Sequence, residues 1–451
     1  MAGKSSHELD IVNGSVFPKY LAFIIPMTLS YMLQIAFNAA DVIVVGRFEG
    51  PNALAAVGST TAIVSLIVNF VVGLSNGVNI VIARDYAGER FDKVSDEVHT
   101  TIVSALIGGI VLAVLGAVSA RPVLELMKSP DDVIGMSASY LLFYYIGLPG
   151  IAVYNFAAAI LRAIGDTKRP MNFLIFSGVL NVILNLLFVI VMKLGVVGVG
   201  AATSISNYVS AFLVLGVLIR EDSCLKFNPK QMKINKAVFS EIMKQGLPVG
   251  LQGSIFSISN MLIQSSVNSF GSVYMAGNAA AQNIESFQQC FISSNLNTIL
   301  TFTSQNVGAK KYRRASNTIR NAWLWGMTGT FILGILTVLF RFPLLSLFTT
   351  SDEVVAVAVR RLIPVVMLEF LGVTMDATAS ALRGFGYSVE PMITTLLGSC
   401  LFRIIWLNTV FVLFPYYEVI IIVWPVSWVV TALANFLYYK KIRKNFPDED
   451  M

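Results

Sequence analysis

The architecture of this chain is decided by a short turn that occurs twice, as Leu161–Asp166 (LRAIGD) and as Leu382–Tyr387 (LRGFGY). Leucine, arginine and glycine coincide at a separation of 221 residues, and a Pro-Met pair follows each turn, at Pro170 and at Pro391. Agreement at several positions with one separation indicates an internal duplication.

Two weaker matches extend the duplication beyond the turn. Pro26 answers Pro248, and Gly88 answers Gly308, at nearly the same separation. The two copies therefore include the segments well before the turn, and each copy is about half of the chain.

The composition places the chain in a bilayer. Its 451 residues are 55% hydrophobic and 13% charged, with a mean hydropathy of +0.72, whereas soluble domains carry about 25% charged residues. So little polar surface predicts a membrane protein. The three cysteines are far apart, and two histidines, His7 and His99, cannot supply a zinc site.

Long runs with few charges mark the membrane helices, because a span needs roughly 20 apolar residues. The run Gln245–Ile284 holds one full helix and the start of the next, which continues to about Asn306. The other expected spans are Leu21–Val45, Ala53–Ala83, Thr100–Ala120, Ile134–Leu161, Pro170–Met192, Leu194–Ile219, Asn321–Phe340, Leu362–Leu382, Pro391–Leu413 and Val419–Tyr439.

These spans predict an all-α polytopic membrane protein with twelve transmembrane helices in two six-helix lobes. Residues 1–225 form the N-lobe with helices 1–6, and residues 226–451 form the C-lobe with helices 7–12. Because six is even, both copies enter the membrane in the same direction, and a pseudo-two-fold axis along the membrane normal relates them. Substrate is expected between the lobes, near the midplane.

The basic residues set the orientation. Most of the 32 lysine and arginine residues lie on one side of the predicted spans, above all in Arg220–Lys236, Lys310–Arg320 and Lys440–Lys444. By the positive-inside rule this side is cytoplasmic, and it carries both termini. The rule explains the net charge of +6 without nucleic acid, and no cleavable signal peptide is visible.

Several motifs then point to a family. The segments are Asn38–Asp41 (NAAD), Val45–Arg47 (VGR), Ala53–Gly58 (ALAAVG), Leu161–Lys168 and Ser304–Ala309 (SQNVGA). At this spacing they resemble the multidrug and toxic compound extrusion (MATE) transporters over nearly the whole chain. The resemblance implies cation-coupled antiport of amphipathic, often cationic compounds through a V-shaped cleft between two six-helix lobes.

The expected biology follows from the resemblance and the spans. We expect a multi-pass protein of a bacterial inner membrane, a monomer whose partners are small-molecule substrates and the lipid bilayer. No cofactor is expected beyond a coupling ion, Na⁺ or H⁺, and no enzymatic activity.

One group of ionisable and polar residues lies inside the N-lobe. Asp41 is the only charge in the first span, and Asn181 and Asn185 share one face of the fifth because they are four residues apart. Counted from the outer membrane surface, Asp41, Asn185 and Thr203 lie at one depth, roughly 14 Å in. One carboxylate with amide and hydroxyl oxygens suits Na⁺ at Asp41 or a titrating carboxyl, and a buried polar network that locks the helices is the alternative. In one branch of the family a matching cluster binds the coupling ion, and aspartate is common at the position of Asn185.

A second group lies in the C-lobe and is a candidate for coupling or for the substrate cleft. Glu369, Asp376 and Arg383 are spaced by seven and share a helix face. Arg403 and Glu369 lie at nearly the same depth in the membrane, so we expect them to form an ion pair, with Glu285 nearby. Asp376 lies closer to the cytoplasm and is expected to be freer to titrate or to bind a cation. The alternatives are a structural ion pair for Arg403 and Glu369, and solvated residues facing a polar cleft for Glu285 and Asp376.

Three functions compete. The first is a secondary antiporter that exports organic compounds, and the second is a flippase for a lipid-linked saccharide. The third, a membrane-embedded enzyme, lacks a catalytic constellation at membrane depth. ATP drive is not expected because the phosphate-binding motif Gly-x-x-x-x-Gly-Lys-[Ser/Thr] is absent.

Overall fold

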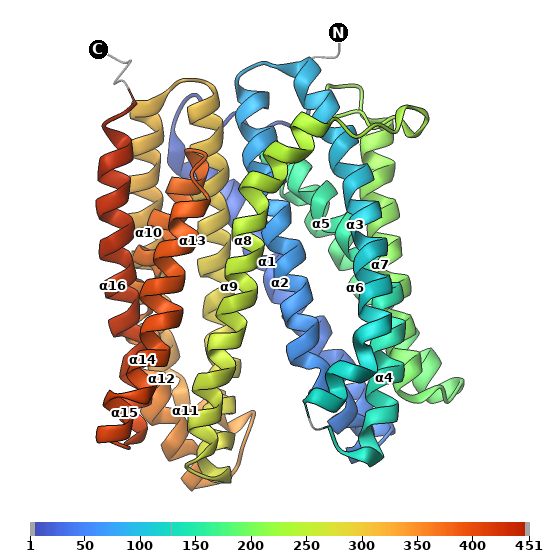
Figure 1. Ribbon diagram of the computed structural model, residues 1–451, viewed down its shortest axis with the longest axis vertical. Coiled ribbons are helices and arrows are strands. Elements are labelled where there is room, and N and C mark those ends of the chain that lie inside the picture. Colours follow the sequence, from blue (N-terminus) through green and yellow to red (C-terminus); the bar gives the residue numbers. More distant parts are fainter. Residues whose placement is uncertain (1–4, 128, 447–451) are drawn as a thin grey trace. The chain divides into compact units, whose positions relative to one another are not determined.

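The computed structural model describes residues 5–127 and 129–446, which form helices joined by short connections with no strand among them (Figure 1). The first half contains α1 (Val16–Phe48), α2 (Pro51–Ala87), α3 (Phe91–Leu126), α4 (Asp131–Ile146), α5 (Leu148–Ala163), α6 (Lys168–Leu186), the π-helical η1 (Leu187–Val191) and α7 (Gly195–Arg220). The second contains the short η2 (Pro229–Gln231), α8 (Lys236–Asn268), α9 (Ser272–Gly308), α10 (Tyr312–Leu339), α11 (Arg341–Ser346), α12 (Asp352–Gly384), α13 (Val389–Thr395), the π-helical η3 (Leu396–Leu401), α14 (Phe402–Asn408), α15 (Val410–Leu413) and α16 (Tyr417–Arg443).

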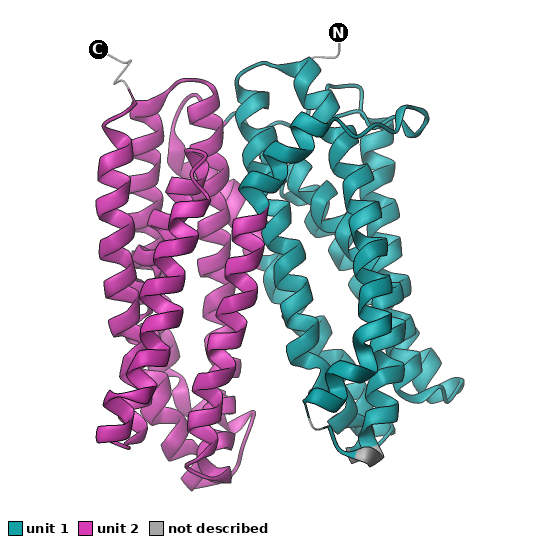
Figure 2. Ribbon diagram, viewed as in Figure 1, with its two compact units in different colours: residues 1–10, 29–246 teal, residues 11–28, 247–451 magenta. Residues whose placement is uncertain are grey.

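The helices divide into two compact units (Figure 2). Unit 1 comprises residues 1–10 and 29–246, and unit 2 comprises residues 11–28 and 247–451. The unit boundaries therefore fall inside α1 and α8. The first turns of α1 belong to unit 2, and the first turns of α8 belong to unit 1.

The duplication is visible within each unit. Helix α3 begins at Phe91 and α10 at Tyr312, which is the same separation of 221 residues. Each is preceded by a non-glycine residue with positive φ, Glu89 at 56° and Lys310 at 60°. In this register the counterpart of Gly88 is Ala309, so the match of Gly88 to Gly308 was wrong by one residue.

The predicted all-α, two-lobe membrane architecture is confirmed. Among the described residues, nine helices are long and apolar enough to cross a membrane, and a bent pair, α4 and α5, makes a tenth span. Helices α9 and α12, of 37 and 33 residues, are equally long but more polar. With these two the structure is consistent with the twelve expected helices.

The fourth span departs from a single straight helix. It bends by 44° between α4 and α5, at Gly147, which is followed by Leu148 and Pro149. Proline cannot donate the backbone hydrogen bond of a continuous helix. A Cβ on Gly147 would lie 2.9 Å from the Cα of Ser204, so α7 approaches the bend at backbone distance.

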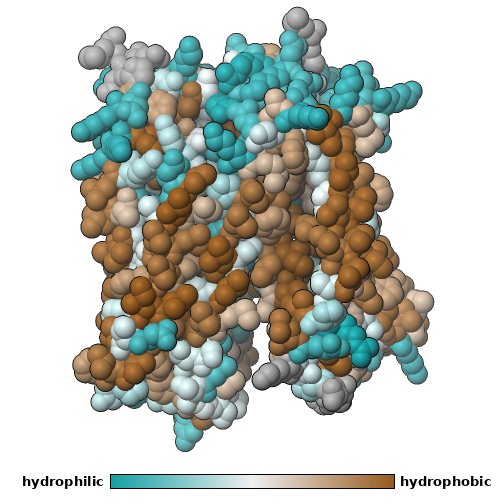
Figure 3. Space-filling view, viewed as in Figure 1, coloured by the Kyte–Doolittle hydropathy of each residue, from teal (hydrophilic) through white to brown (hydrophobic). Residues whose placement is uncertain are grey.

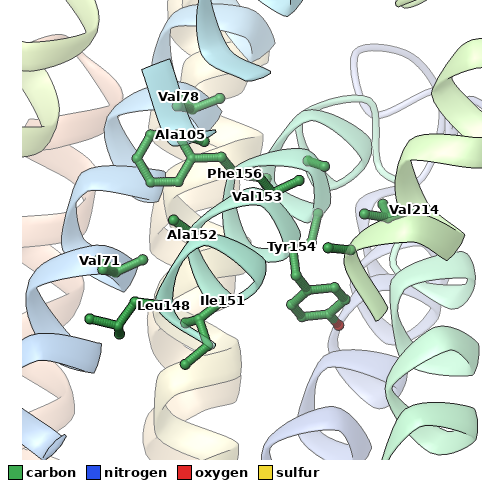
Figure 4. Close-up of a cluster of buried hydrophobic side chains, with 14 of the residues drawn as sticks. Val71, Val78, Ala105, Leu148, Ile151, Ala152, Val153, Tyr154, Phe156 and Val214 are labelled. Carbon is green, nitrogen blue, oxygen red and sulfur yellow. The ribbon is translucent and has the colours of Figure 1, made fainter. Parts of the chain in front are cut away.

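Helix α5 forms the centre of unit 1. Nearly all of its residues are buried, and the close-up in Figure 4 shows them facing Val71 and Val78 of α2, Ala105 of α3 and Val214 of α7. A helix that is apolar all round belongs in a core. In the space-filling view (Figure 3), hydrophobic residues cover the middle of the helices in each unit, while hydrophilic residues gather where α2 meets α3 and α9 meets α10.

The contact between α3 and α5 supplies a test of this packing. A Cβ at Gly109 would lie 2.6 Å from the Cα of Pro149, whereas a Cβ at the adjacent Gly108 would meet nothing within 4 Å. Small residues let membrane helices approach closely. We therefore expect Gly109→Ala to lower stability by about 1–3 kcal/mol and Gly108→Ala to be neutral, measured by thermal unfolding in detergent. Equal unfolding temperatures for the two variants would contradict the packing.

Candidate functional site

Unit 1 brings Asp41 of α1 together with three polar residues of α6 and α7. The Asn185 amide donates to Oδ1 of Asp41, and the Thr203 hydroxyl lies 3.3 Å from Oδ2. Asn181 joins the group through Asn185, at 3.2 Å, and through Thr203, at 3.4 Å. The three residues that the sequence placed at one depth, Asp41, Asn185 and Thr203, are therefore in contact, and Asn181, on the same helix face as Asn185, joins them.

The group is rich in oxygen atoms, and three of its members are buried while Thr203 is half-buried. Asp41 is 8% exposed, Asn181 6% and Asn185 fully buried. The Oδ1 atom of Asn185 is buried and has no hydrogen-bond partner among the described residues. The Thr203 hydroxyl also lies 3.0 Å from the carbonyl oxygen of Val199, and its single proton can serve only one acceptor at a time.

Asp41 has no cationic partner in the described part of the chain: its hydrogen bonds come from an amide and a hydroxyl. A carboxylate at membrane depth without a counter-charge is costly, about 2.5–3.5 kcal/mol or more. Such a carboxyl is stable when it holds a proton or a bound cation. The π-helical η1 begins two residues after Asn185, and π-helical turns are frequent at functional sites.

Unit 2 contains a closed ion pair that the sequence analysis missed. Arg361 of α12 donates to both carboxylate oxygens of Glu285 of α9, at 2.9 and 2.7 Å, and to Asn278 at 2.9 Å. Arg361 is 4% exposed. This bidentate pair neutralises Glu285, which therefore does not join a group around Arg403.

The expected Arg403–Glu369 pair is wrong. Arg403 is fully buried and donates to Ser427 at 3.0 Å and to Asn260 at 3.4 Å. Its guanidinium lies over the rings of Trp424, at 4.1 Å, and Phe256, at 4.9 Å. Aromatic faces therefore stabilise this cation where a carboxylate was predicted.

The two remaining acids of unit 2 form no salt bridge with that cation in the described residues, although the charges of Asp376 and Arg403 act on each other. Glu369 is 2% exposed and accepts a hydrogen bond from Gln289 of α9. Asp376 is half-buried and makes no hydrogen bond with the described residues. Arg383, the third residue of the predicted face, donates to Gln252 at 2.7 Å. Asp376 therefore lies within the electrostatic reach of Arg383 and Arg403 and is hydrogen-bonded to neither.

Arg361 was missed because the apolar run that predicts its span begins one residue later, at Leu362. An arginine just before a span is expected at the membrane surface. The structure begins α12 at Asp352, with two acids in its first turn. Acidic residues after a serine are a helix-start signal. Read from that start, Arg361 lies about 14 Å along the helix, at the depth of an intramembrane residue.

The neighbouring Arg360 supplies a matched control for the buried pair. Arg360 is exposed and lies 3.6 Å from Glu418, also exposed. Breaking a buried pair leaves an uncompensated charge, at a cost of about 3–5 kcal/mol, whereas an exposed pair contributes roughly 0–1 kcal/mol. We expect Arg361→Met to lower the unfolding temperature far more than Arg360→Met, and Glu285→Gln to restore part of the loss. Equal effects of the two arginine substitutions would contradict the assignment.

The comparisons agree with this architecture. A family model described as MatE matches the chain twice, over residues 26–187 and 248–407. The two matches repeat the internal duplication.

The similar proteins are transporters. The chain is 29% identical over 446 residues to a probable multidrug resistance protein, YoeA, of Bacillus subtilis, with 95% of each chain covered. It is 22% identical over 334 residues to a FAD transporter of Shewanella oneidensis, covering 73% of this chain and 74% of the relative.

A solved structure shares the fold. The outward-facing conformation of a multidrug resistance MATE family transporter of the MOP superfamily superimposes with a TM-score of 0.89 at 20% identity, covering 98% of this chain and 99% of the other. The MatE model spans most of both copies. This chain therefore belongs to the MatE family of multidrug and toxic compound extrusion transporters, and it is a multi-pass membrane transporter rather than an enzyme.

Proposed function

We propose that this transporter is a secondary antiporter that exports amphipathic, often cationic organic compounds in exchange for Na⁺ or H⁺. The observation that carries the proposal is the lone carboxyl of Asp41, buried among amide and hydroxyl groups with no cationic partner in the described residues. A group that must gain or lose a cation to be stable at membrane depth is suited to coupling.

The residues around Asp41 orient its carboxyl group and supply oxygen atoms for a cation. Asn185 and Thr203 hydrogen-bond its two oxygens and hold the carboxyl in one orientation. The side-chain oxygens of Asn181, Asn185 and Thr203 are ligands that a small hard cation accepts. When the coupling ion is H⁺, the same donors stabilise the carboxylate after the proton leaves.

Coupling requires that cation and cargo favour different conformations of the transporter. In the proposed cycle, the N-lobe (residues 1–225) and the C-lobe (residues 226–451) alternate access to the two membrane surfaces, with both termini cytoplasmic. Binding of the cation at Asp41 favours one conformation, and binding of cargo favours the other.

The proposed cationic cargo rests on the acids of unit 2. Glu369 and Asp376 form no salt bridge with the described residues, although arginine charges act on both, and these acids favour cationic compounds. One similar protein is named a probable multidrug resistance protein and another a FAD transporter. These names do not favour a flippase for a lipid-linked saccharide.

Replacing Asp41 tests the coupling role. In proteoliposomes, we expect Asp41→Asn to reduce efflux of a fluorescent cationic dye driven by an imposed Na⁺ or pH gradient by at least tenfold, because the amide cannot exchange a cation. Glu125→Gln is the matched control, since Glu125 is an exposed acid paired with exposed Arg121. Asp376→Asn and Glu369→Gln show whether unit 2 couples instead. Full coupled efflux by Asp41→Asn would exclude the proposed site.

Replacing Thr203 tests whether its hydroxyl oxygen binds Na⁺. If Na⁺ is the coupling ion, we expect Thr203→Val to raise the Na⁺ concentration that gives half-maximal efflux by about tenfold, because a ligand oxygen is lost at a charged site. Thr203→Ser keeps the hydroxyl and should stay close to the parent chain. A Na⁺ dependence unchanged in both variants would remove Thr203 from the ion site.

A further inference from the structure

Unit 1 has a cavity at the place where the start of α6 and the last turns of α7 meet. Its volume is about 760 Å³. Besides these two helices, residues 6–7 near the N-terminus and residues 221–223 after α7 line it. All of these residues belong to unit 1, so the cavity is complete within that unit.

The cavity is charged at one end and apolar at the other. On α6, Arg169 is followed after one turn by Phe173, and on α7, Arg220 is preceded after one turn by Gly216 and after two turns by Phe212. Residues four apart share a helix face. Both arginines lie directly outside the predicted fifth and sixth spans, and both phenylalanines lie inside them. The cavity therefore crosses the boundary between headgroups and hydrocarbon.

The charges of the lining balance one another. The charged side chains are two arginines and two acids, Arg169, Arg220, Glu221 and Asp222. Arg169 donates to the carboxylate of Glu221, at 3.1 Å, and to that of Asp166. Arg169 and Glu221 are thus compensated within the chain, and the charges left for a ligand are those of Arg220 and Asp222.

These two residues present opposite charges to the same cavity. Both are exposed, and within the described part of the chain Arg220 has neither a salt bridge nor a side-chain hydrogen bond. Asp222 lies 3.5 Å from Lys226, which is also exposed, and exposed pairs of this kind contribute little. A ligand that binds to both residues carries an anionic and a cationic group, so the cavity suits a zwitterion.

The two helix ends favour the same ligand. The start of α6 carries partial positive charge and the end of α7 partial negative charge. The last carbonyl groups of a helix have no partner within it, and that of Leu218 accepts from the Phe227 amide at 2.9 Å. The remaining carbonyls at the end of α7 can accept from a primary ammonium group, whereas a quaternary ammonium has no N–H to donate.

Gly216 opens the apolar end of the cavity. A Cβ at Gly216 would meet nothing within 4 Å. Phe173 lines the same space from α6 and Phe212, which is 69% exposed, from α7. Apolar space at the depth of the spans favours hydrocarbon over water. The cavity therefore fits a ligand with a zwitterionic head and an acyl chain.

We propose that this cavity binds phosphatidylethanolamine. The phosphate lies at Arg220, the ammonium at Asp222 and the end of α7, and an acyl chain lies over Gly216 between Phe173 and Phe212. The leaflet is cytoplasmic in the orientation of the proposed function, but lipid binding does not depend on the proposed ion coupling. The two helices that hold the lipid also carry the amide and hydroxyl groups of the candidate ion site.

The test is a lipid titration of the full purified chain in detergent, with the first bound lipid counted by native mass spectrometry. Phosphatidylethanolamine is compared with phosphatidylcholine and phosphatidylglycerol that have the same acyl chains. We expect phosphatidylethanolamine to bind about fivefold more tightly than either, because phosphatidylcholine lacks an N–H donor and phosphatidylglycerol lacks a cation. Equal or tighter binding of either lipid would overturn the proposal.

Substitutions test each part of the cavity. We expect Gly216→Leu to weaken phosphatidylethanolamine binding by about tenfold, because the leucine occupies the space of the acyl chain. Gly108→Leu, at another open glycine of unit 1, should bind as the parent chain does. Arg220→Gln should weaken binding about fivefold. Asp222→Asn should abolish the preference over phosphatidylcholine, and Lys226→Gln should keep it.

Three results would contradict the site. They are unchanged binding by Gly216→Leu, an equal loss in Gly108→Leu, and a lipid preference that survives in Asp222→Asn. Asp222 is exposed, so its variant decides the matter even if Gly216→Leu unfolds. Displacement of the lipid by millimolar glycerophosphoethanolamine, which has no acyl chains, would show a site for a soluble zwitterion and would also overturn the proposal.

Discussion

Hydrocarbon does not solvate a charge, and this constraint accounts for the surroundings of Arg361, Glu285, Arg403 and Asp41. Arg361 and Glu285 form a bidentate pair, and Arg403 lies between aromatic faces with two neutral acceptors. In both arrangements the groups that stabilise the charge, the Glu285 carboxylate and the aromatic rings around Arg403, are part of the chain and do not need to be exchanged. Asp41 has amide and hydroxyl neighbours but no counter-charge among the described residues. Its compensation has to come from outside the chain, which makes it a residue through which a cation gradient can act.

The two copies share a scaffold and differ in where their charges are balanced. Positive φ at Glu89 and Lys310, and helix starts at Phe91 and Tyr312, recur at one separation. The bent pair of α4 and α5, by contrast, corresponds to the single helix α12. In unit 1, Glu241 of α8 forms salt bridges with Arg84 and Lys93. Asp41 has no salt bridge with the described residues of this unit. Unit 2 has a closed pair at membrane depth. The duplication supplies the transporter fold, and the divergence of the copies supplies separate tasks.

The sequence predicted the parts that depend on position along a helix. The spans and the common depth of Asp41, Asn185 and Thr203 follow from counting residues at 1.5 Å each. The duplication follows from motifs that recur at one separation along the chain. The pairing of Arg403 with Glu369 failed because equal depth does not give equal direction: each residue turns the helix face by about 100°. Arg403 faces Trp424 and Ser427, and Glu369 faces Gln289. Arg361 was missed because its helix starts earlier than its apolar run. The bend at Gly147 lies beside Pro149, and the close approach of α7 at that point cannot be counted along one helix.

The central claim is that the lone carboxyl of Asp41 exchanges the coupling cation. Its most direct test is to measure, on purified chain without any membrane gradient, the protons or Na⁺ ions released when a cationic substrate binds. The account predicts that substrate releases a cation from the parent chain, that Asp41→Asn releases none, and that Glu125→Gln behaves as the parent chain does. Undiminished release from Asp41→Asn, or release abolished only by Asp376→Asn or Glu369→Gln, would contradict it.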